Sequence, residues 1–391
     1  MYEFTTLGAI IGLALAIVLI ILKVHPAYSL ILGALVGGLI GGGGLVTTVN
    51  TMVSGASSMM SSVLRIMTSG VLAGALIKTR AAQKIAETIV DKMGQKLALA
   101  AIALATMIIC AVGVFVDISV ITVAPIALAI GKKAGLSKQS LLLAMIGGGK
   151  AGNIVSPNPN TIAASEAFGV DLTSLMFKNI VPALLALVVT ILLATLLSKK
   201  KNGLAVAQSD IESSDANLPG FLPAILGPLV VIVLLALRPI AGVTIDPLIA
   251  LPAGGLICML VTGQLKQVVK ITEFGLSKVV GVSILLIGTG TIAGVIKASA
   301  LQYDMIDLLE TLKMPAFVLA PLAGILMAGA TASTTAGATI ASQTFAETLI
   351  ASGVPALSAG AMIHAGATVV DSLPHGSFFH ATGGSVNLTI K

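Results

Sequence analysis

Residues 147–165 read GGGKAGNIVSPNPNTIAAS, which gathers glycine, proline, asparagine and one lysine inside a chain that is otherwise apolar. The glycines at 147–149 are expected to end one helix, and Asn160 is expected to cap the next. Amide and hydroxyl side chains at such a break can bind substrate hydroxyls, and a helix N-terminus favours an anion. The candidate binding residues of this first break are Gly149, Lys150, Asn153, Ser156, Asn158, Asn160 and Thr161.

A second polar tract, AGATASTTAGATIAS at residues 328–342, contains hydroxyl groups and no charge. Its candidate binding residues are Thr331, Ser333, Thr334 and Thr335. Small hydroxylated side chains can hydrogen-bond to ligand oxygens or coordinate Na⁺. The alternative is that these hydroxyls bond to their own helix backbone or serve close packing.

Titratable groups occur in two further stretches, GVFVDISVIT (113–122) and HAGATVVDSLPHGSFFH (364–380). We expect Asp117, Asp371 and His364 to be candidate proton carriers, because buried carboxyl groups and histidines titrate within reach of neutral pH. His375 and Ser377 are further candidate substrate contacts. Asp117 has an alternative place at the tip of a helical hairpin. The histidine spacings match no familiar zinc pattern, so no metal site is predicted.

The elements that position these residues belong to a membrane protein. Of the 391 residues, 56% are hydrophobic and 10% are charged, and the mean hydropathy is +1.06. A soluble domain carries about a quarter charged residues, whereas several stretches here reach the roughly 20 apolar residues of a membrane span. We therefore predict an all-α polytopic membrane protein with about 10–12 spans. The net charge of +6 fits lysine-rich cytoplasmic loops and does not indicate a nucleic-acid partner.

A polar stretch divides the chain nearly in half. We predict N-terminal membrane helices over 1–50, a first repeat over 51–197, a cytoplasmic linker over 198–220 and a second repeat over 221–391. AMIGGGKAGNIVSP at 144–157 aligns with AMIHAGATVVDSLP at 361–374, which is an offset of 217 residues. The second repeat lacks a counterpart of the apolar stretch 179–198, so its final helix is expected to be missing.

Each half places a glycine- and proline-rich break at a corresponding position. Paired interruptions of this kind are typical of the substrate site of a secondary transporter. Irregular backbone is tolerated at membrane depth where protein buries it or where it lines a water-filled cavity. The alternative for the first break is a surface loop in which Lys150 extends to the membrane interface.

At SPNPNTIAASEAFGVDL and at HAGATVVDSLPHGSFF the sequence resembles the gluconate permease family over the whole chain. The resemblance implies two inverted repeats with re-entrant hairpins and broken helices, an elevator-like movement and a homodimer. It implies paired breaks at 149–161 and 330–336, with 371–377 beside them.

The predicted function is proton-coupled symport of a small hydroxylated monocarboxylate, such as gluconate, glycerate or a related sugar acid, across a bacterial inner membrane. No cofactor or enzymatic activity is expected beyond the coupling ion. A Na⁺-coupled carboxylate transporter is the near alternative, and an ion channel or an intramembrane hydrolase is more remote.

Overall fold

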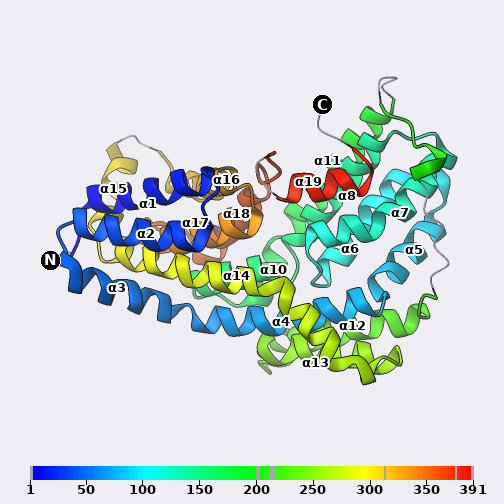
Figure 1. Cartoon of the computed structure of the whole chain (residues 1–391), viewed down its shortest axis with the longest axis horizontal. Helices are drawn as coiled ribbons and strands as arrows, with labels where there is room; N and C mark the ends of the chain where they lie inside the picture. The colour runs from blue at the N-terminus through cyan, green and yellow to red at the C-terminus, as the bar shows by residue number, and fades with distance from the viewer. Residues whose placement is uncertain (1–2, 200–202, 211–216, 312–313, 375–376, 389–391) are drawn as a thin grey trace. The chain divides into compact units, whose positions relative to one another are not determined.

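The computed structural model describes residues 3–199, 203–210, 217–311, 314–374 and 377–388, and these residues form helices joined by short turns (Figure 1). Within these ranges there is no strand, and only two isolated bridges pair Phe4 with Ser299 and Ser137 with Ala205. The predicted all-α class is therefore confirmed.

The helices of the first half run from the N-terminus to the linker. They are α1 (Thr6–Ile21), α2 (Pro26–Ile40), α3 (Gly44–Ser58), α4 (Met60–Lys78), α5 (Ala81–Met93), η1 (Gln95–Leu97), α6 (Ala98–Ala111), α7 (Val116–Ala134), α8 (Lys138–Asn153), α9 (Pro159–Ala167), α10 (Leu172–Lys178) and α11 (Ile180–Ser198).

The helices of the second half begin with a short turn in the linker. They are η2 (Gln208–Asp210), α12 (Phe221–Ala241), α13 (Pro247–Val261), η3 (Leu265–Gln267), α14 (Val268–Lys297), α15 (Leu301–Thr311), η4 (Ala316–Val318), α16 (Leu319–Thr331), α17 (Thr334–Ala351), α18 (Ala356–Ala367) and α19 (Ser377–Ser385).

Helix boundaries recur between the halves at the offset seen in the sequence. Moved by 217 residues, α7 would cover 333–351, and α17 covers Thr334–Ala351. The same shift carries α8 onto α18 and α9 onto α19 within about a turn. The helix order therefore agrees with an internal repeat, and the inversion of one repeat relative to the other stays a prediction.

The chain packs into two compact units, and each takes helices from both halves. Unit 1 contains Met1–Met67, Pro159–Lys178 and Val279–Gly376, whereas unit 2 contains Thr68–Asn158, Asn179–Lys278 and Ser377–Lys391. Helix α9 of the first half packs against α17 and α18 in unit 1, and α19 of the second half packs against α7 and α8 in unit 2. The helix that follows each break is thus exchanged between the halves.

Glycines let the helices of unit 1 approach backbone to backbone. A Cβ on Gly12 of α1 would lie 2.6 Å from the Gly33 carbonyl oxygen of α2. A Cβ on Gly366 of α18 would lie 2.5 Å from the Pro321 carbonyl oxygen of α16. Small residues at such crossings are how membrane helices associate closely.

Unit 2 uses the same device. Cβ atoms on Gly148 and Gly152 of α8 would clash with the carbonyl oxygens of Ala103 and Met107 on α6. Gly147 faces the Thr190 side chain of α11. The glycine run of α8 therefore seats this helix between α6 and α11.

Three helical segments are long and apolar enough to cross a membrane, namely α4, α11 and the continuous segment Leu265–Lys297. A fourth results if the pair Ala81–Met93 and Gln95–Ala111, bent by 108°, counts as one broken span. This is fewer than the predicted 10–12 spans in the described part of the chain, because many apolar stretches form helices of 10–17 residues or end at breaks.

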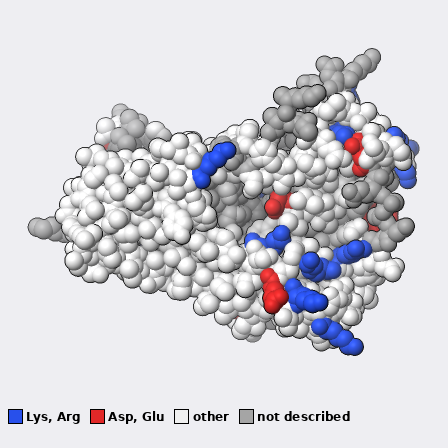
Figure 2. All heavy atoms as spheres, viewed as in Figure 1, with Lys and Arg blue, Asp and Glu red and all other residues white. Residues whose placement is uncertain are grey.

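Apolar side chains cover much of the surface. On α11, Val181 is 65% exposed and Leu185 is 62% exposed, as expected of residues that face lipid. Figure 2 shows that lysine and arginine gather over unit 2, whereas the visible surface of unit 1 is almost entirely uncharged.

The described part of the linker packs on unit 2. The Lys138 backbone N–H at the start of α8 donates to the Leu204 carbonyl at 2.9 Å. The Lys138 Nζ lies 2.8 Å from Asp210 Oδ1, and these side chains are only 10% and 8% exposed. Asn387 Nδ2 donates to the same oxygen at 3.1 Å. Residues 203–210 are therefore not the freely solvated linker that the sequence suggests, and we call Lys138, Asp210 and Asn387 the linker clasp.

Candidate functional site

The glycines of the first break do not end a helix, contrary to the sequence prediction. Helix α8 continues through Gly147, Gly148 and Gly149 as far as Asn153. The reason is tertiary, because contact with α6 and α11 requires residues without a Cβ here. Gly149 likewise faces Val116, whose Cγ1 would lie 2.7 Å from an added Cβ. Gly149 is thus a packing residue in this structure.

The break itself covers residues 154–158, and its own side chains satisfy part of its backbone. Asn158 Nδ2 donates to the Asn153 carbonyl at 2.8 Å and also bonds to Asn153 Oδ1. Asn179 Nδ2, just before α11, donates to the Ile154 carbonyl at 3.2 Å. Asn153, Ser156 and Asn158 are all buried. The break is therefore an ordered polar segment inside the protein and not a surface loop.

Lys150 lies in the last turn of α8, where the negative end of the helix dipole favours a cation. Its side chain is half-buried, and Nζ lies 5.9 Å from the ring centroid of Phe378 on α19. An ammonium group held in this position can pair with a carboxylate that enters beside α8.

Asn160 does not cap a helix, also contrary to the prediction. Helix α9 begins at Pro159, so Asn160 lies inside its first turn. Proline is favoured at the first helical position because it has no N–H to satisfy. Asn160 and Thr161 are both buried within unit 1.

The second tract forms the turn between α16 and α17. Thr331 Oγ1 donates to the Met327 carbonyl at 2.8 Å and to the Ser333 carbonyl at 3.2 Å. Ala332 has a left-handed backbone with φ of 44°, and Ser333 Oγ accepts from the Ala336 N–H at 3.3 Å as the N-cap of α17. These two hydroxyls hold the turn, while Thr335 is half-buried one residue further into the helix than Thr334.

Asp371 brings this turn together with the segment that follows α18. The Thr334 hydroxyl donates to Asp371 Oδ2, and the Ser372 hydroxyl donates to Oδ1 at 2.9 Å. Asp371 is only 2% exposed. Within unit 1 the structure thus joins two sequence-predicted sites into one polar cluster.

His364 is fully buried in α18, and neither ring nitrogen has a hydrogen-bond partner among the described residues. The hydroxyls of Thr339 and Ser342 on α17 share both properties. Ala338 of α17 packs with Ala367 of α18, and the two helices form a tight hairpin.

Thr339 and Ser342 were not singled out from the sequence, although both lie in the hydroxyl-rich tract. Their signal was the continuation of threonine and serine past residue 335 at helical spacing. We call His364, Thr339 and Ser342 the buried polar set of unit 1.

The remaining predicted residues lie elsewhere. Asp117 is half-buried in the first turn of α7, directly after the turn at 112–115 that joins α6 to α7. Ser377 is the exposed first residue of α19. His375 lies outside the described residues. In the ranges that the structure describes, no three histidine, cysteine or acidic side chains come together as metal ligands.

Comparison with known proteins places the chain in a family. The GntP family permease profile matches residues 4–391. The chain is 53% identical over 392 residues to an uncharacterized transporter of Haemophilus influenzae, covering all of this chain and 93% of that protein. It is 23% identical over 252 residues to a high-affinity gluconate transporter of Escherichia coli K12, covering 62% of this chain and 55% of that protein.

A solved structure supports the architecture. The fold is similar to the crystal structure of the Alcanivorax borkumensis YdaH transporter, which is described as having an unusual topology. The TM-score is 0.62 at 18% identity, over 87% of this chain and 80% of that chain. With its apolar helices and its interrupted helix pairs, the chain belongs to the GntP permease family and is an integral membrane permease rather than an enzyme.

Proposed function

We propose that this permease carries a small hydroxylated monocarboxylate, such as gluconate or glycerate, together with a proton. The observation that carries this proposal is the set of polar side chains at the first helix interruption. Buried amides and hydroxyls at Asn153, Ser156 and Asn158 match a polyol, and Lys150 matches one carboxylate. The related gluconate transporter supports the same substrate class.

The proton would be bound in unit 1, at Asp371 and at the buried polar set. Neither ring nitrogen of the buried His364 has a hydrogen-bond partner among the described residues, and histidine is a side chain that can take up and release a proton. The carboxyl of Asp371 already receives two hydroxyl hydrogen bonds. Asp117, which is half-buried in the first turn of α7, is the weaker candidate.

Sodium coupling is the second candidate, and one observation favours it. The hydroxyl oxygens of Thr339, Ser342 and Thr344 on α17 are buried without a hydrogen-bond partner in the described chain. Hydroxyl oxygens can coordinate Na⁺ without any titratable group, so uptake through such a site would require Na⁺ and would not acidify the vesicle.

The test uses purified protein in liposomes that contain a pH-sensitive dye. Gluconate, glycerate and non-hydroxylated butyrate are added separately, with and without Na⁺, and protein-free liposomes correct for passive entry of undissociated acid. Protein-dependent acidification by hydroxy acids alone supports the proposal. A strict Na⁺ requirement without acidification would transfer coupling to the α17 hydroxyls. No response from folded protein would contradict the substrate class.

His364→Gln separates coupling from binding. It is expected to abolish acidification but to retain exchange of labelled substrate across the vesicle membrane, because exchange requires no net proton movement. His25→Gln is the matched control, since His25 is exposed at the start of α2. Equal acidification by the His364 variant and wild type would remove His364 from the mechanism.

We further propose that the permease lies in the bacterial cytoplasmic membrane as a homodimer, with the lysine-rich linker on the cytoplasmic side. Labelling of a single cysteine introduced at exposed Lys199 in intact cells and in inverted vesicles tests this orientation.

A further inference from the structure

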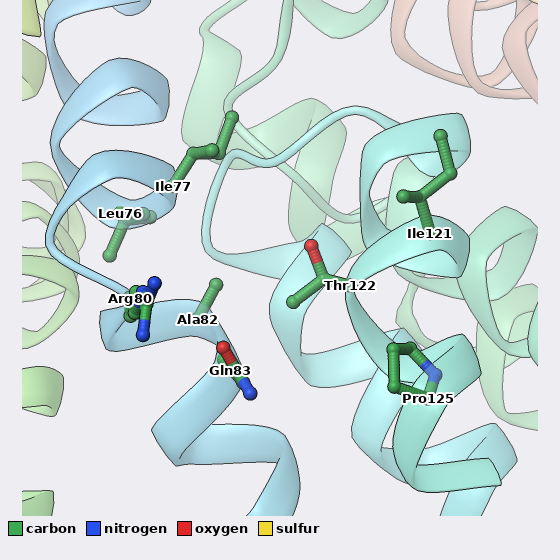
Figure 3. Close-up of a pocket in the computed structure, with 8 residues that line it drawn as sticks. All are labelled: Leu76, Ile77, Arg80, Ala82, Gln83, Ile121, Thr122 and Pro125. Atoms are coloured by element: carbon green, nitrogen blue, oxygen red, sulfur yellow. The ribbon is translucent and has the colours of Figure 1, made fainter. Parts of the chain in front are cut away.

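A cavity of about 260 Å³ lies in unit 2 where α4 turns into α5 and both face α7 (Figure 3). Its polar lining consists of Arg80, Gln83 and Thr122. Leu76, Ile77 and Pro125 supply apolar walls. Figure 3 shows Arg80 and Gln83 approaching from the start of α5 and Thr122 from α7, around the same space. None of these residues belongs to the helix interruptions described above.

Arg80 has an unusual backbone and a side chain that no acid neutralises. Its φ of 59° is left-handed, a conformation that non-glycine residues rarely adopt and that often marks functional positions. Among the described residues Arg80 forms no ion pair, whereas Arg65 pairs with Glu166. Glu87, the nearest acid along α5, pairs with Lys84 at 3.0 Å. The guanidinium is therefore available to a ligand.

Two lysines lie near Arg80 beside the end of α4, and one of them, Lys278, also interacts with the Asp117 carboxylate of α7. Lys78 ends α4, two residues before Arg80, and its Nζ lies 4.2 Å from the Phe274 ring centroid. Lys278 approaches the same ring at 5.0 Å, so two ammonium groups converge beside this end of α4. Like charges gathered at one place attract an anion. The first-turn N–H groups of Ala82 and Gln83 have no intrahelical acceptor, so they also attract an anion, though more weakly than the charged side chains.

We propose that this cavity is a binding site for the carboxylate of a small organic acid with a short carbon chain. The planar guanidinium of Arg80 would hold the carboxylate through two parallel hydrogen bonds. The Gln83 amide and the Thr122 hydroxyl would complete its hydrogen bonding, and the apolar walls would take the carbon chain. The mostly apolar wall distinguishes this site from the amide- and hydroxyl-lined interruptions. The inference goes beyond the proposed function and stands whether or not that substrate assignment holds.

The sequence alone does not reveal this site. Arg80 reads as a basic anchor at the end of a span, and a lipid phosphate would meet the same guanidinium at a membrane surface. The pocket lies between three helices of one unit and places an amide and a hydroxyl beside the guanidinium, and this lining favours a solute that binds there.

The test measures binding of butyrate to the purified full chain in lipid-free detergent, by titration calorimetry and by the shift in melting temperature. Butyrate has no hydroxyl groups, so of the contacts proposed at the first interruption only the Lys150 ammonium remains for it. Butyramide, which is uncharged, is the matched ligand control. We expect butyrate to bind and butyramide not to bind. Loss of a charge-assisted contact should weaken butyrate binding about tenfold or more in Arg80→Gln.

Variants locate the binding. Thr122→Val should weaken it by a smaller factor, while Lys96→Gln, on the exposed surface, should leave it unchanged. Lys150→Gln, at the first break, distinguishes butyrate bound there from butyrate bound in the cavity. If Arg80→Gln does not fold, the butyrate affinity of Thr122→Val tests the proposal instead. Equal affinity in wild type and the Arg80 and Thr122 variants would overturn the proposal, as would loss of binding in Lys150→Gln alone.

A further experiment with added lipids distinguishes a lipid phosphate from a solute carboxylate as the bound anion. Phosphatidylglycerol and phosphatidylcholine are each added to the detergent-purified protein. If only phosphatidylglycerol raises the melting temperature through Arg80, and butyrate does not bind, the occupant is a lipid phosphate and the carboxylate proposal is wrong. Absence of hydroxy-acid transport in liposomes would leave the butyrate result unaffected, so the two proposals fail separately.

Discussion

Unit 1 and unit 2 interrupt corresponding helices, but they fill the interruptions with different chemistry. In unit 2 the helix before the break carries Gly147 and the cation Lys150, and amides follow. At the positions matched by the repeat, unit 1 has His364 in place of Gly147 and Asp371 in place of Ile154. One helix plan thus supports amides, hydroxyls and one cation in unit 2, and a histidine and a carboxyl group in unit 1. This difference suggests that substrate recognition and ion coupling are divided between the units.

The shared part of the comparison is the glycine packing, and breaking it should have the largest effect. Gly148→Ala on α8 and Gly324→Ala on α16 each place a Cβ against a backbone carbonyl of a neighbouring helix, Ala103 and Ile363 respectively. Overpacking of this kind costs about 1–3 kcal/mol. We expect both variants to show a lower melting temperature and less monodisperse protein after solubilisation.

Gly281→Ala is the control for both glycine variants, because a Cβ there meets no atom within 4 Å. If only one of the two packed variants is destabilised, the units do not share this packing requirement.

Asp371 in unit 1 and Asp117 in unit 2 test which unit binds the coupling proton. Asp371→Asn removes the charge from a buried group that accepts two hydroxyl hydrogen bonds, and it should lower substrate-driven acidification about tenfold or more. Asp117→Asn, at a half-buried position in the first turn of α7 in unit 2, should have a clearly smaller effect. Initial rates in dye-loaded liposomes give both values. A larger loss for Asp117 would reverse the assignment of ion coupling to unit 1.

Lys150 tests the substrate side. Lys150→Gln removes the cation at the end of α8 and should raise KM several-fold with a smaller change in kcat, because a surface-accessible charge pair is worth about 1 kcal/mol. Lys150→Arg retains the charge and should keep most of the affinity. Uptake of labelled gluconate at several concentrations measures both constants, and an unchanged KM in Lys150→Gln would exclude a role in carboxylate binding.

Disruption of the linker clasp should change stability least of the variants considered. The clasp has no described counterpart in unit 1. The Lys138 ammonium, with the Asn387 amide and the Ala207 N–H, lowers the pKa of Asp210. A depressed carboxyl pKa stabilises the fold above the unfolded pKa of about 4, and that contribution is lost as the pH falls through the lower folded value.

Asp210→Asn should therefore lower the melting temperature by a few degrees at pH 7, with the difference from wild type shrinking in acid. Asp91→Asn, on the exposed end of α5, is the control. A difference that persists unchanged in acid would show that charge is not the cause.

Much of the fold could be predicted from composition. A chain with long apolar stretches and few charges cannot cover a water-facing surface, so its helices are expected to lie in a membrane. The turn at 112–115 and the turn between α16 and α17 could be predicted as interruptions. Gly113 and Asp117 interrupt the first apolar run, and glycine, serine and threonine interrupt the second. The helicity of Gly147, Gly148 and Gly149 could not. Glycine costs a helix about 1 kcal/mol locally, and the contact with α6 that offsets this cost lies some 40 residues away in the sequence.

The sequence predicted which residue types belong to the candidate site, but it predicted their individual roles less well. The hydroxyls of Thr331 and Ser333 stabilise a turn, and the Asn158 amide donates to the Asn153 carbonyl within the first break. These roles depend on local geometry that the sequence does not specify. The contact of Thr334 with Asp371 and the cavity at Arg80 depend on helices that meet only in the folded unit.

The exchange of α9 and α19 between the halves has a consequence for biosynthesis. Helix α9 packs against the neighbouring α10, but it meets α17 and α18 only after roughly 170 further residues have been made, which takes about 10–30 s at ordinary elongation rates. During that interval Asn160 and Thr161, buried in the finished unit, must be held by water or by the insertion machinery. The packing of the first half of the chain is therefore completed only when the second half has been made.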